Sequence, residues 1–276
     1  MIAPTFENAT EIEGVIARSA AASLLGALRL IAALAALLAT FRYCGLFDVA
    51  RFRDAAPTIV ALIADATPPD FSRWRGWVGP FFDTLAMSLS GTSLAAFLSL
   101  LLAPCAASNT APLWLRIPVR LGLNAMRSIP AVIWGVVFVA AVGFGPLPGA
   151  LALCCHSTGM LGKLYSETLE HVEPGPGLAL RSQGVSYFGV LRYGVFPQVF
   201  PRLVDVTLYR FEHNIHAATV MGLVGAGGLG LEVTTAFHLF EYREAFALIL
   251  VMLALATIVN FVGATLRAHF LGRESL

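Results

Sequence analysis

The chain has 276 residues, of which 57% are hydrophobic and only 13% are charged, and its mean hydropathy is +0.76. These values exclude an ordinary water-soluble globule and indicate a protein that resides in a membrane. The formal net charge of +1 lacks the basic excess typical of nucleic-acid-binding proteins, so no nucleic-acid partner is expected.

The N-terminal segment, residues 1–21, is predicted to lie in the cytoplasm, ahead of a first transmembrane helix over residues 22–43. It opens with glutamates instead of the positively charged region that a cleaved signal peptide needs, so the first apolar helix is expected to stay in the protein. The apolar run is interrupted only by Arg29, which lies near one end and can extend its guanidinium to the interface.

Residues 44–80 are predicted to form a periplasmic or interfacial segment along the membrane surface. This stretch mixes aspartates and arginines with Trp74 and Trp77. Tryptophan is enriched at the membrane–water interface, so the mixture is typical of an extramembrane stretch with an interfacial anchor.

The remaining transmembrane core is predicted over residues 81–270. A helix needs about 20 largely apolar residues to cross the hydrocarbon, and long windows without charge supply them. The longest window is broken at residues 143–149 by the sequence GFGPLPG, which is rich in helix-breaking glycine and proline. The five further spans are predicted at residues 81–104, 118–143, 147–169, 202–224 and 244–266.

Six predicted spans place both termini on the same side, and the basic residues favour the cytoplasm for that side. With this orientation the inner regions hold nine Lys and Arg residues and the outer regions hold six. Because Lys and Arg are in excess in the cytoplasmic loops of membrane proteins, a multi-pass protein with cytoplasmic termini is expected.

The connection at residues 171–201 is too polar to span the bilayer and too long to be a simple linker. Apolar residues recur in it at spacings of three and four, which predicts short amphipathic helices with Gly184 as the hinge between them. We expect such a unit to dock on a partner; the alternative is a connecting helix pair without a partner.

The spacing from Gly184 to Pro197 resembles the cytoplasmic EAA loop of binding-protein-dependent ABC importer permeases, although Leu178 replaces the leading glutamate of that loop. The flanking sequences HSTGMLGKLYSETLEHVEPGPG and YRFEHNIHAATVMGLVGAGGLG resemble the membrane subunit of phosphonate importers. The likeness to phosphonate ABC transporter permeases extends from about Pro68 to Phe270.

The resemblance implies an all-α polytopic membrane protein with the type I ABC importer permease (MetI-like) fold and about six transmembrane helices. It also implies a homodimer in the bacterial inner membrane that forms the path for phosphonate or a phosphite-like oxyanion. The implied partners are two copies of an ABC ATPase subunit and a periplasmic solute-binding protein. An importer for another small solute, an ion-driven secondary transporter and a membrane-embedded enzyme are the alternatives.

In the resembling family, the short helix around the loop glycine sits in a groove of the ATPase, so closure of the ATPase moves the membrane helices as rigid bodies. Carried over to this sequence, the coupling segment is residues 177–189. The implied ATPase-coupling residues are Arg181, Ser182, Gly184, Val185, Tyr187 and Pro197.

Two glycine-rich strings are interpreted as structural. Residues 225–230 match the GxGxxG pattern, but the chain has no βαβ alternation, so a flexible, closely packed helix end is the better interpretation. Residues 159–163, GMLGK, lack the glycine spacing and the following Ser or Thr of a phosphate-binding loop. ATP hydrolysis is therefore expected on a separate chain, and no catalytic residue, cofactor or metal is predicted here.

The fifth predicted span holds Asp205, Arg210 and Glu212, and the third holds Arg127. A charge at the bilayer centre costs about 2.5–3.5 kcal/mol, so these groups are expected to face the bundle or a cavity. In a structural hypothesis the two arginines pair with the two carboxylates or with their counterparts across a dimer. In a functional hypothesis one or both arginines line a path and donate transient hydrogen bonds to an oxyanion. The candidate path residues are Arg127, His156, Ser157, Arg210 and Asn214.

Overall fold

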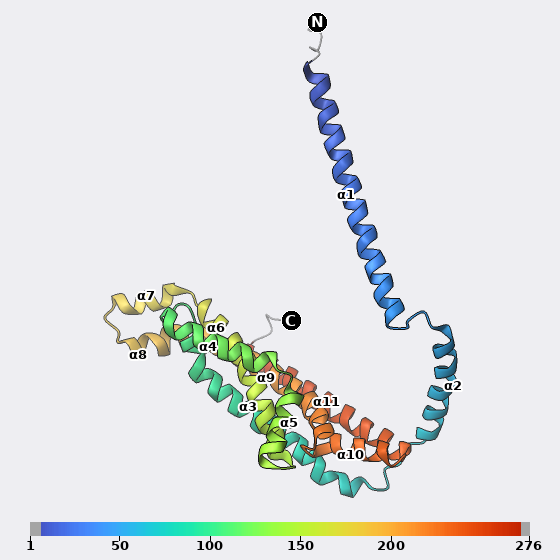
Figure 1. The fold of residues 1–276 in the computed structure, drawn as a ribbon. Coiled ribbons are helices and arrows are strands. Elements are labelled where there is room, and N and C mark those ends of the chain that lie inside the picture. Colours follow the sequence, from blue (N-terminus) through green and yellow to red (C-terminus); the bar gives the residue numbers. More distant parts are fainter. Residues whose placement is uncertain (1–6, 272–276) are drawn as a thin grey trace. The chain divides into compact units, whose positions relative to one another are not determined.

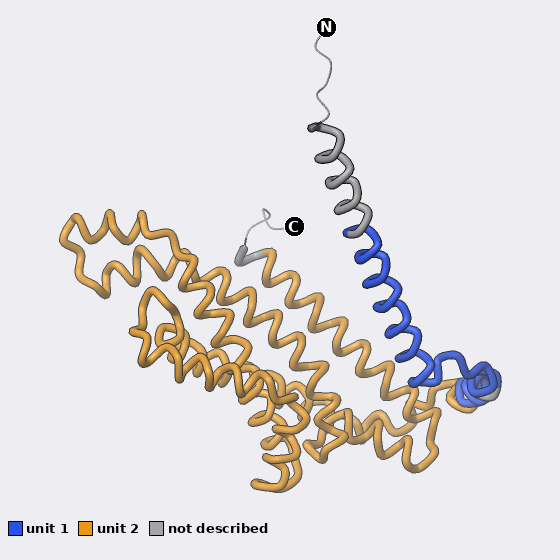
Figure 2. Tube along the Cα trace, turned by 45° about the horizontal axis from the view of Figure 1, so that its top comes forward, with its two compact units in different colours: residues 1–64 blue, residues 65–276 orange. Residues whose placement is uncertain are grey.

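The chain is all-helical in the computed structural model, which describes residues 7–271 and has no strand among them (Figure 1). The predicted all-α class is therefore confirmed. The helices fall into two compact units, Met1–Ala64 and Asp65–Leu276, which Figure 2 shows in blue and orange.

The first unit carries α1 (Glu7–Tyr43) and most of α2 (Val49–Ala66). The stretch Ala22–Tyr43 of α1 is apolar enough to cross a membrane, and none of it is buried within the chain. This stretch coincides with the predicted first span. Much of the segment predicted as interfacial, residues 44–80, is helical in α2, whose alanines favour a helix.

The second unit is built around α3 and α6, which pack along each other. α6 also contacts α4, α5 and α9, so it is the most enclosed helix of the unit. The elements are α3 (Trp74–Ala106), α4 (Leu113–Ser128), α5 (Ala131–Val142), α6 (Pro146–Glu170), α7 (Pro174–Ser182), α8 (Tyr187–Val190), the π-helical turn η1 (Leu191–Val195), α9 (Phe196–Met221), the 3-10 turn η2 (Gly222–Val224), α10 (Gly228–His238) and α11 (Tyr242–Leu271).

By length and composition, three of the described helices can cross a membrane, or up to five spans result if each of two bent helix pairs counts as one. The sequence predicts six spans, and the difference is α6, at the predicted span 147–169. Its charged residues Lys163, Glu167 and Glu170 lower its hydropathy. Because other helices cover much of α6 in place of lipid, it does not need to be apolar on every face.

The predicted third span, residues 118–143, is wrong as a single helix. The structure divides it into α4 and α5, which are bent by 90° at a short break. Pro130 explains the break, because proline lacks a backbone N–H and disfavours helical geometry at the preceding residue. Ile129 is accordingly extended, with a ψ of 122°, and Pro130 occupies the N-cap of α5.

The predicted fifth span, residues 202–224, also differs from the structure. α9 begins earlier, at Phe196, because the charged residues near its start do not interrupt the helical backbone. After η2 the chain turns into α10, which is bent by 46° from the preceding helix and was not predicted.

The turn between α9 and α10 contains the GxGxxG string. Gly225, Gly227 and Gly228 have φ of +88°, +81° and +71°, values that favour glycine. A Cβ on Gly230 of α10 would lie 1.8 Å from the Thr219 carbonyl oxygen of α9. The structural interpretation of the string is confirmed, because it makes a turn and a close helix contact.

Gly230→Ala is expected to destabilise the bundle, because the added methyl group meets a backbone carbonyl that cannot move alone. Overpacking of this kind costs about 1–3 kcal/mol or more, so the Tm of the purified protein should fall by several degrees. Gly122→Ala on α4 is the matched control, since nothing lies within 4 Å of a Cβ placed there. Equal Tm values for the two variants would contradict the prediction.

At one end of the unit, the buried carboxylate of Glu244 on α11 holds the start of α3. It accepts hydrogen bonds from Trp77 Nε1 at 3.2 Å and from Arg73 Nη1 at 3.0 Å. The Asp70 N–H donates to the Arg243 carbonyl oxygen at 3.1 Å, which adds a backbone contact. These bonds fix the first turns of α3 and α11 together.

At the other end, Glu170 at the close of α6 holds the connection between α3 and α4. It accepts hydrogen bonds from the Ser108 backbone N–H at 2.6 Å and from Arg120 of α4. Burial opposes the charge on Glu170, but the hydrogen bonds from Ser108 and the Arg120 guanidinium outweigh it, so the pKa of the carboxyl lies below its ordinary value. Glu170 is therefore ionised at neutral pH and stays paired.

Candidate functional site

A cluster of polar side chains, hereafter the central cluster, lies where α3, α6 and α9 meet. Arg210 Nε on α9 donates to Ser157 Oγ on α6 at 2.9 Å, and Ser157 Oγ donates to Asn214 Oδ1 at 3.1 Å. Asn214 Nδ2 donates to Thr92 Oγ1 on α3 at 2.8 Å. All four residues are buried. The structure thus brings together three of the predicted path residues, with Arg210 and Asn214 one turn apart on one helix face.

Hydroxyl groups of α3 complete the polar surroundings of the cluster. Ser88 Oγ donates to the Asn214 carbonyl oxygen at 3.2 Å, and Ser99 Oγ donates to the Thr158 carbonyl oxygen at 3.3 Å. Gly91 lets the helices approach, since a Cβ there would lie 2.9 Å from Leu153 Cβ on α6. Small and hydroxylated residues therefore set the spacing that places Ser157 beside α9.

The guanidinium of Arg210 has no carboxylate partner in the described part of the chain. Arg210 is 5% exposed, and its Nη2 has no hydrogen-bond partner there. The carboxylates of the structural hypothesis bind elsewhere: Asp205 lies 2.6 Å from Arg202, and Glu212 lies 2.8 Å from Arg267. The hypothesis is therefore wrong about pairing within the chain. A buried cation that is only partly hydrogen-bonded is costly and unusual.

Two histidines lie near Arg210. His156, which precedes Ser157 on α6, places Nδ1 3.0 Å from the Ile129 carbonyl oxygen at the break between α4 and α5. His213 lies on α9, three residues after Arg210. The predicted path residues do not include His213. Its position three residues after Arg210, on a shared helix face, was the available signal.

Arg127 lies outside the central cluster. It is near the end of α4, where its Nε donates to Asn124 Oδ1 at 3.0 Å. With Arg120 and Lys163 it lines a separate cavity between α4 and α6. The five predicted path residues are therefore divided between two places in the bundle.

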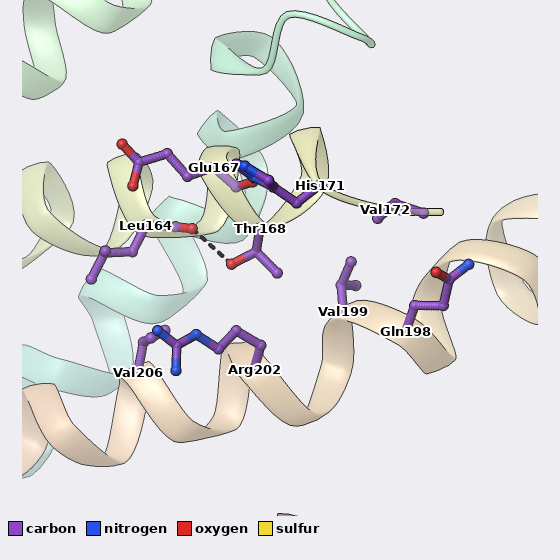
Figure 3. A pocket seen from close by; sticks show the side chains of 9 residues that line it. All are labelled: Leu164, Glu167, Thr168, His171, Val172, Gln198, Val199, Arg202 and Val206. Carbon is purple, nitrogen blue, oxygen red and sulfur yellow. Dashed lines mark hydrogen bonds between the residues drawn. The ribbon is translucent and has the colours of Figure 1, made fainter. Parts of the chain in front are cut away.

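Another polar cavity, of about 320 Å³, lies between the end of α6 and the start of α9 (Figure 3). Its polar groups already have partners: Arg202 binds Asp205, and His171 Nδ1 lies 2.7 Å from the Glu167 carbonyl oxygen. The Thr168 hydroxyl donates to a backbone carbonyl of α6, as Figure 3 shows. We therefore assign no site to this cavity.

The loop at residues 171–201 folds into α7, α8 and η1, hereafter the hairpin. Gly184 joins α7 to α8 with a φ of +77°, and nothing lies within 4 Å of a Cβ placed on it. Ser186 then caps α8 by accepting a hydrogen bond from the Gly189 N–H at 3.4 Å. The predicted short helices and the predicted hinge are confirmed.

The surface of the hairpin is open, with aromatic side chains beside the predicted coupling residues. Phe188 is 81% exposed and Tyr187 is 61% exposed. Of the predicted coupling residues, Val185 is half-buried. The others are exposed, namely Arg181, Ser182, Gly184, Tyr187 and Pro197.

The hairpin is tied to α9. Gly194 of η1 packs on α7, where a Cβ on it would lie 3.2 Å from the Cα of Gly177. Gln198 of α9 accepts a hydrogen bond from the Glu173 N–H at 3.1 Å and donates to the Gly194 carbonyl oxygen. A displacement of the hairpin is therefore expected to reach α9, the helix that carries Arg210.

Known proteins resemble the chain over most of its length. Residues 95–274 match the family described as binding-protein-dependent transport system inner membrane component. The chain belongs to this family. The prediction of an importer permease subunit is confirmed.

Similar proteins from bacteria carry related descriptions. The phosphite transport system permease protein PtxC of Stutzerimonas stutzeri is 48% identical over 229 residues, which cover 83% of each chain. The phosphate-import permease protein PhnE of Mycolicibacterium smegmatis is 37% identical over 217 residues, which cover 78% of this chain and 40% of that protein.

The fold also has solved counterparts. A chain of the inward-facing MetNI methionine ABC transporter aligns with a TM-score of 0.61 at 19% identity, over 70% of this chain and 95% of that chain. This likeness confirms the predicted type I importer permease fold.

Proposed function

We propose that the chain forms the path by which phosphite or a phosphonate crosses the bacterial inner membrane. The observation that carries this proposal is the buried guanidinium of Arg210, which lacks a carboxylate partner among the described residues and keeps one terminal nitrogen unbound. The 48% identity to a phosphite permease supports the choice of anion. Arginine suits it, because a guanidinium forms strong charge-assisted hydrogen bonds to phosphorus oxyanions.

The chemistry of the central cluster fits a passing anion better than a tightly held one. Arg210 supplies charge, while Ser157 and Asn214 supply polar groups already bonded to one another. They replace only part of the water shell of an oxyanion, so binding stays weak enough for release. His156 at the same level adds a further polar group.

The motor for this path is a separate ATPase that binds the hairpin. In this proposal two permease chains form a homodimer, two ATPase subunits dock on the two hairpins, and a periplasmic solute-binding protein delivers the anion. The exposed residues around Gly184 and the aromatic Tyr187 form the ATPase contact. Gln198 then transmits the movement of the hairpin to α9 and the central cluster.

Reconstitution in liposomes with the ATPase and the binding protein tests the choice of substrate. We expect phosphite or methylphosphonate, loaded on the binding protein, to stimulate ATP hydrolysis, and methionine to have no effect. Stimulation by methionine alone would overturn the oxyanion assignment. Stimulation by phosphate alone would replace phosphite and phosphonate with phosphate as the cargo.

A further inference from the structure

α4 carries a polar stripe on the face that it turns to α6. Arg120, Asn124 and Arg127 are spaced four and three residues apart, so they share one side of the helix. All three line a cavity of about 190 Å³ between the two helices. This volume is several times the ~30 Å³ that one water molecule occupies in the liquid.

α6 carries a polar stripe with the same spacing. Lys163, Glu167 and Glu170 also lie four and three residues apart and line the same cavity. The cavity is therefore lined by three cations and two carboxylates, of which Lys163 is exposed and the other four are half-buried. Charged residues within membrane spans pair with one another or face a water-filled cavity, and they often mark a pathway for ions or substrates.

The charges in the cavity are unequally paired. Glu170 binds Arg120, and Glu167 lies 3.4 Å from Lys163. Arg127 has only the amide oxygen of Asn124, at 3.0 Å, and among the described residues it forms no ion pair. One guanidinium is thus left with positive charge available to an anion.

The cavity lies on the hairpin side of the central cluster. Between the two, Gly159, two residues after Ser157, packs closely on α4, since a Cβ on it would be 2.6 Å from the Arg127 backbone nitrogen. The two polar stripes run from this contact toward Glu170, at the end of α6 that leads into the hairpin. The cations therefore form a series from the middle of the bundle to its hairpin end.

We propose that the cavity between α4 and α6 is a second oxyanion site, which receives the cargo from Arg210 and holds it at Arg127 before release on the hairpin side. The inference rests on the proposed function and adds a stage to it. Arg127 supplies the free charge, and Lys163 supplies an ammonium that can leave Glu167 for the anion, because an exposed ion pair is weak.

Cysteine labelling tests this site without requiring turnover. In a background whose native cysteines are replaced by alanine, and which retains uptake, Asn124→Cys places a thiol in the cavity. A charged thiol reagent is added from the hairpin side of inside-out vesicles, with and without phosphite or methylphosphonate. We expect the anion to slow labelling about tenfold, because it occupies the cavity for most of the time at saturating concentration. Gln183→Cys, exposed on the hairpin, is the control and should label at an unchanged rate.

Arg127→Gln in the same background is expected to reduce the protection from about tenfold to about twofold, because anion binding weakens about tenfold while the anion concentration is unchanged. Glu167→Cys, which lines the same cavity and keeps all three of its cations, provides a second labelling position if the first variant does not fold. Unchanged labelling at both positions, in a protein whose wild type imports phosphite, would overturn the second site and leave the proposed function intact. A wild-type complex that imports neither phosphite nor methylphosphonate would instead overturn the proposed function.

Discussion

Arg210→Met is expected to lower phosphite uptake about 10- to 100-fold while the permease still folds and binds its ATPase. A hydrogen bond to a charged group is worth about 1.5–3 kcal/mol, and its loss from the path gives this factor. Methionine is nearly as long as arginine and apolar. Because Nη2 is buried without a partner and no carboxylate is left behind among the described residues, the Tm should stay equal or rise. Uptake in proteoliposomes and thermal unfolding of the purified permease are the two measurements.

Arg267→Met is the control that separates transport from structure. It removes the partner of Glu212, a carboxylate that is only 14% exposed, and is expected to cost about 2 kcal/mol of stability. This is less than for a fully buried pair, because Arg267 is 25% exposed. The Tm should therefore stay equal or rise in Arg210→Met and fall in Arg267→Met. Normal uptake by Arg210→Met, or a large fall in its Tm, would place Arg210 among the structural residues.

Gly184→Val is expected to lower ATPase stimulation and uptake about 10-fold without changing the Tm of the isolated permease. At a φ of +77° a residue with a Cβ is strained by about 1–2 kcal/mol, and a β-branched residue by more, so the hairpin should lose its shape. No neighbour lies within 4 Å of the added Cβ, so the change does not disturb packing elsewhere. Copurification with the ATPase and the stimulated rate of hydrolysis measure the effect.

Gly184→Asn is the matched control, because asparagine adopts the left-handed conformation more readily than other residues with a side chain. It should retain most of the coupling although its side chain is about as large as valine. If Gly184→Val couples as well as the wild type, the shape of the hairpin at this position has no role. If both variants lose coupling equally, the added side chain blocks contact with the ATPase at this position, and the backbone conformation is not the cause.

The parts of the fold that depend on local sequence were predictable. The helical period places Arg210 and Asn214 on one face, and the Gly184 hinge follows from glycine between two amphipathic runs. The 90° bend was missed although Pro130 signals it, because the charge-free window continues across the proline. Hydropathy alone therefore predicts one continuous helix, where the proline breaks the backbone into two.

The partners of the charged residues were not predictable. The pairing of Glu212 with Arg267 and the binding of Arg210 to Ser157 join helices that are distant in sequence. No period or motif specifies which of several buried charges meet, since that depends on how the helices pack. For the same reason the sequence placed Arg127 with Arg210, whereas the structure gives Arg127 a cavity between α4 and α6.

The source of energy for uptake tests the central claim most directly. Proteoliposomes containing this permease and its ATPase are supplied with phosphite-loaded binding protein, and internal phosphite is measured. The account predicts accumulation only with internal ATP and a hydrolysis-competent ATPase, and none from a proton or sodium gradient. Accumulation driven by an ion gradient, with the ATPase inactive or absent, would contradict it.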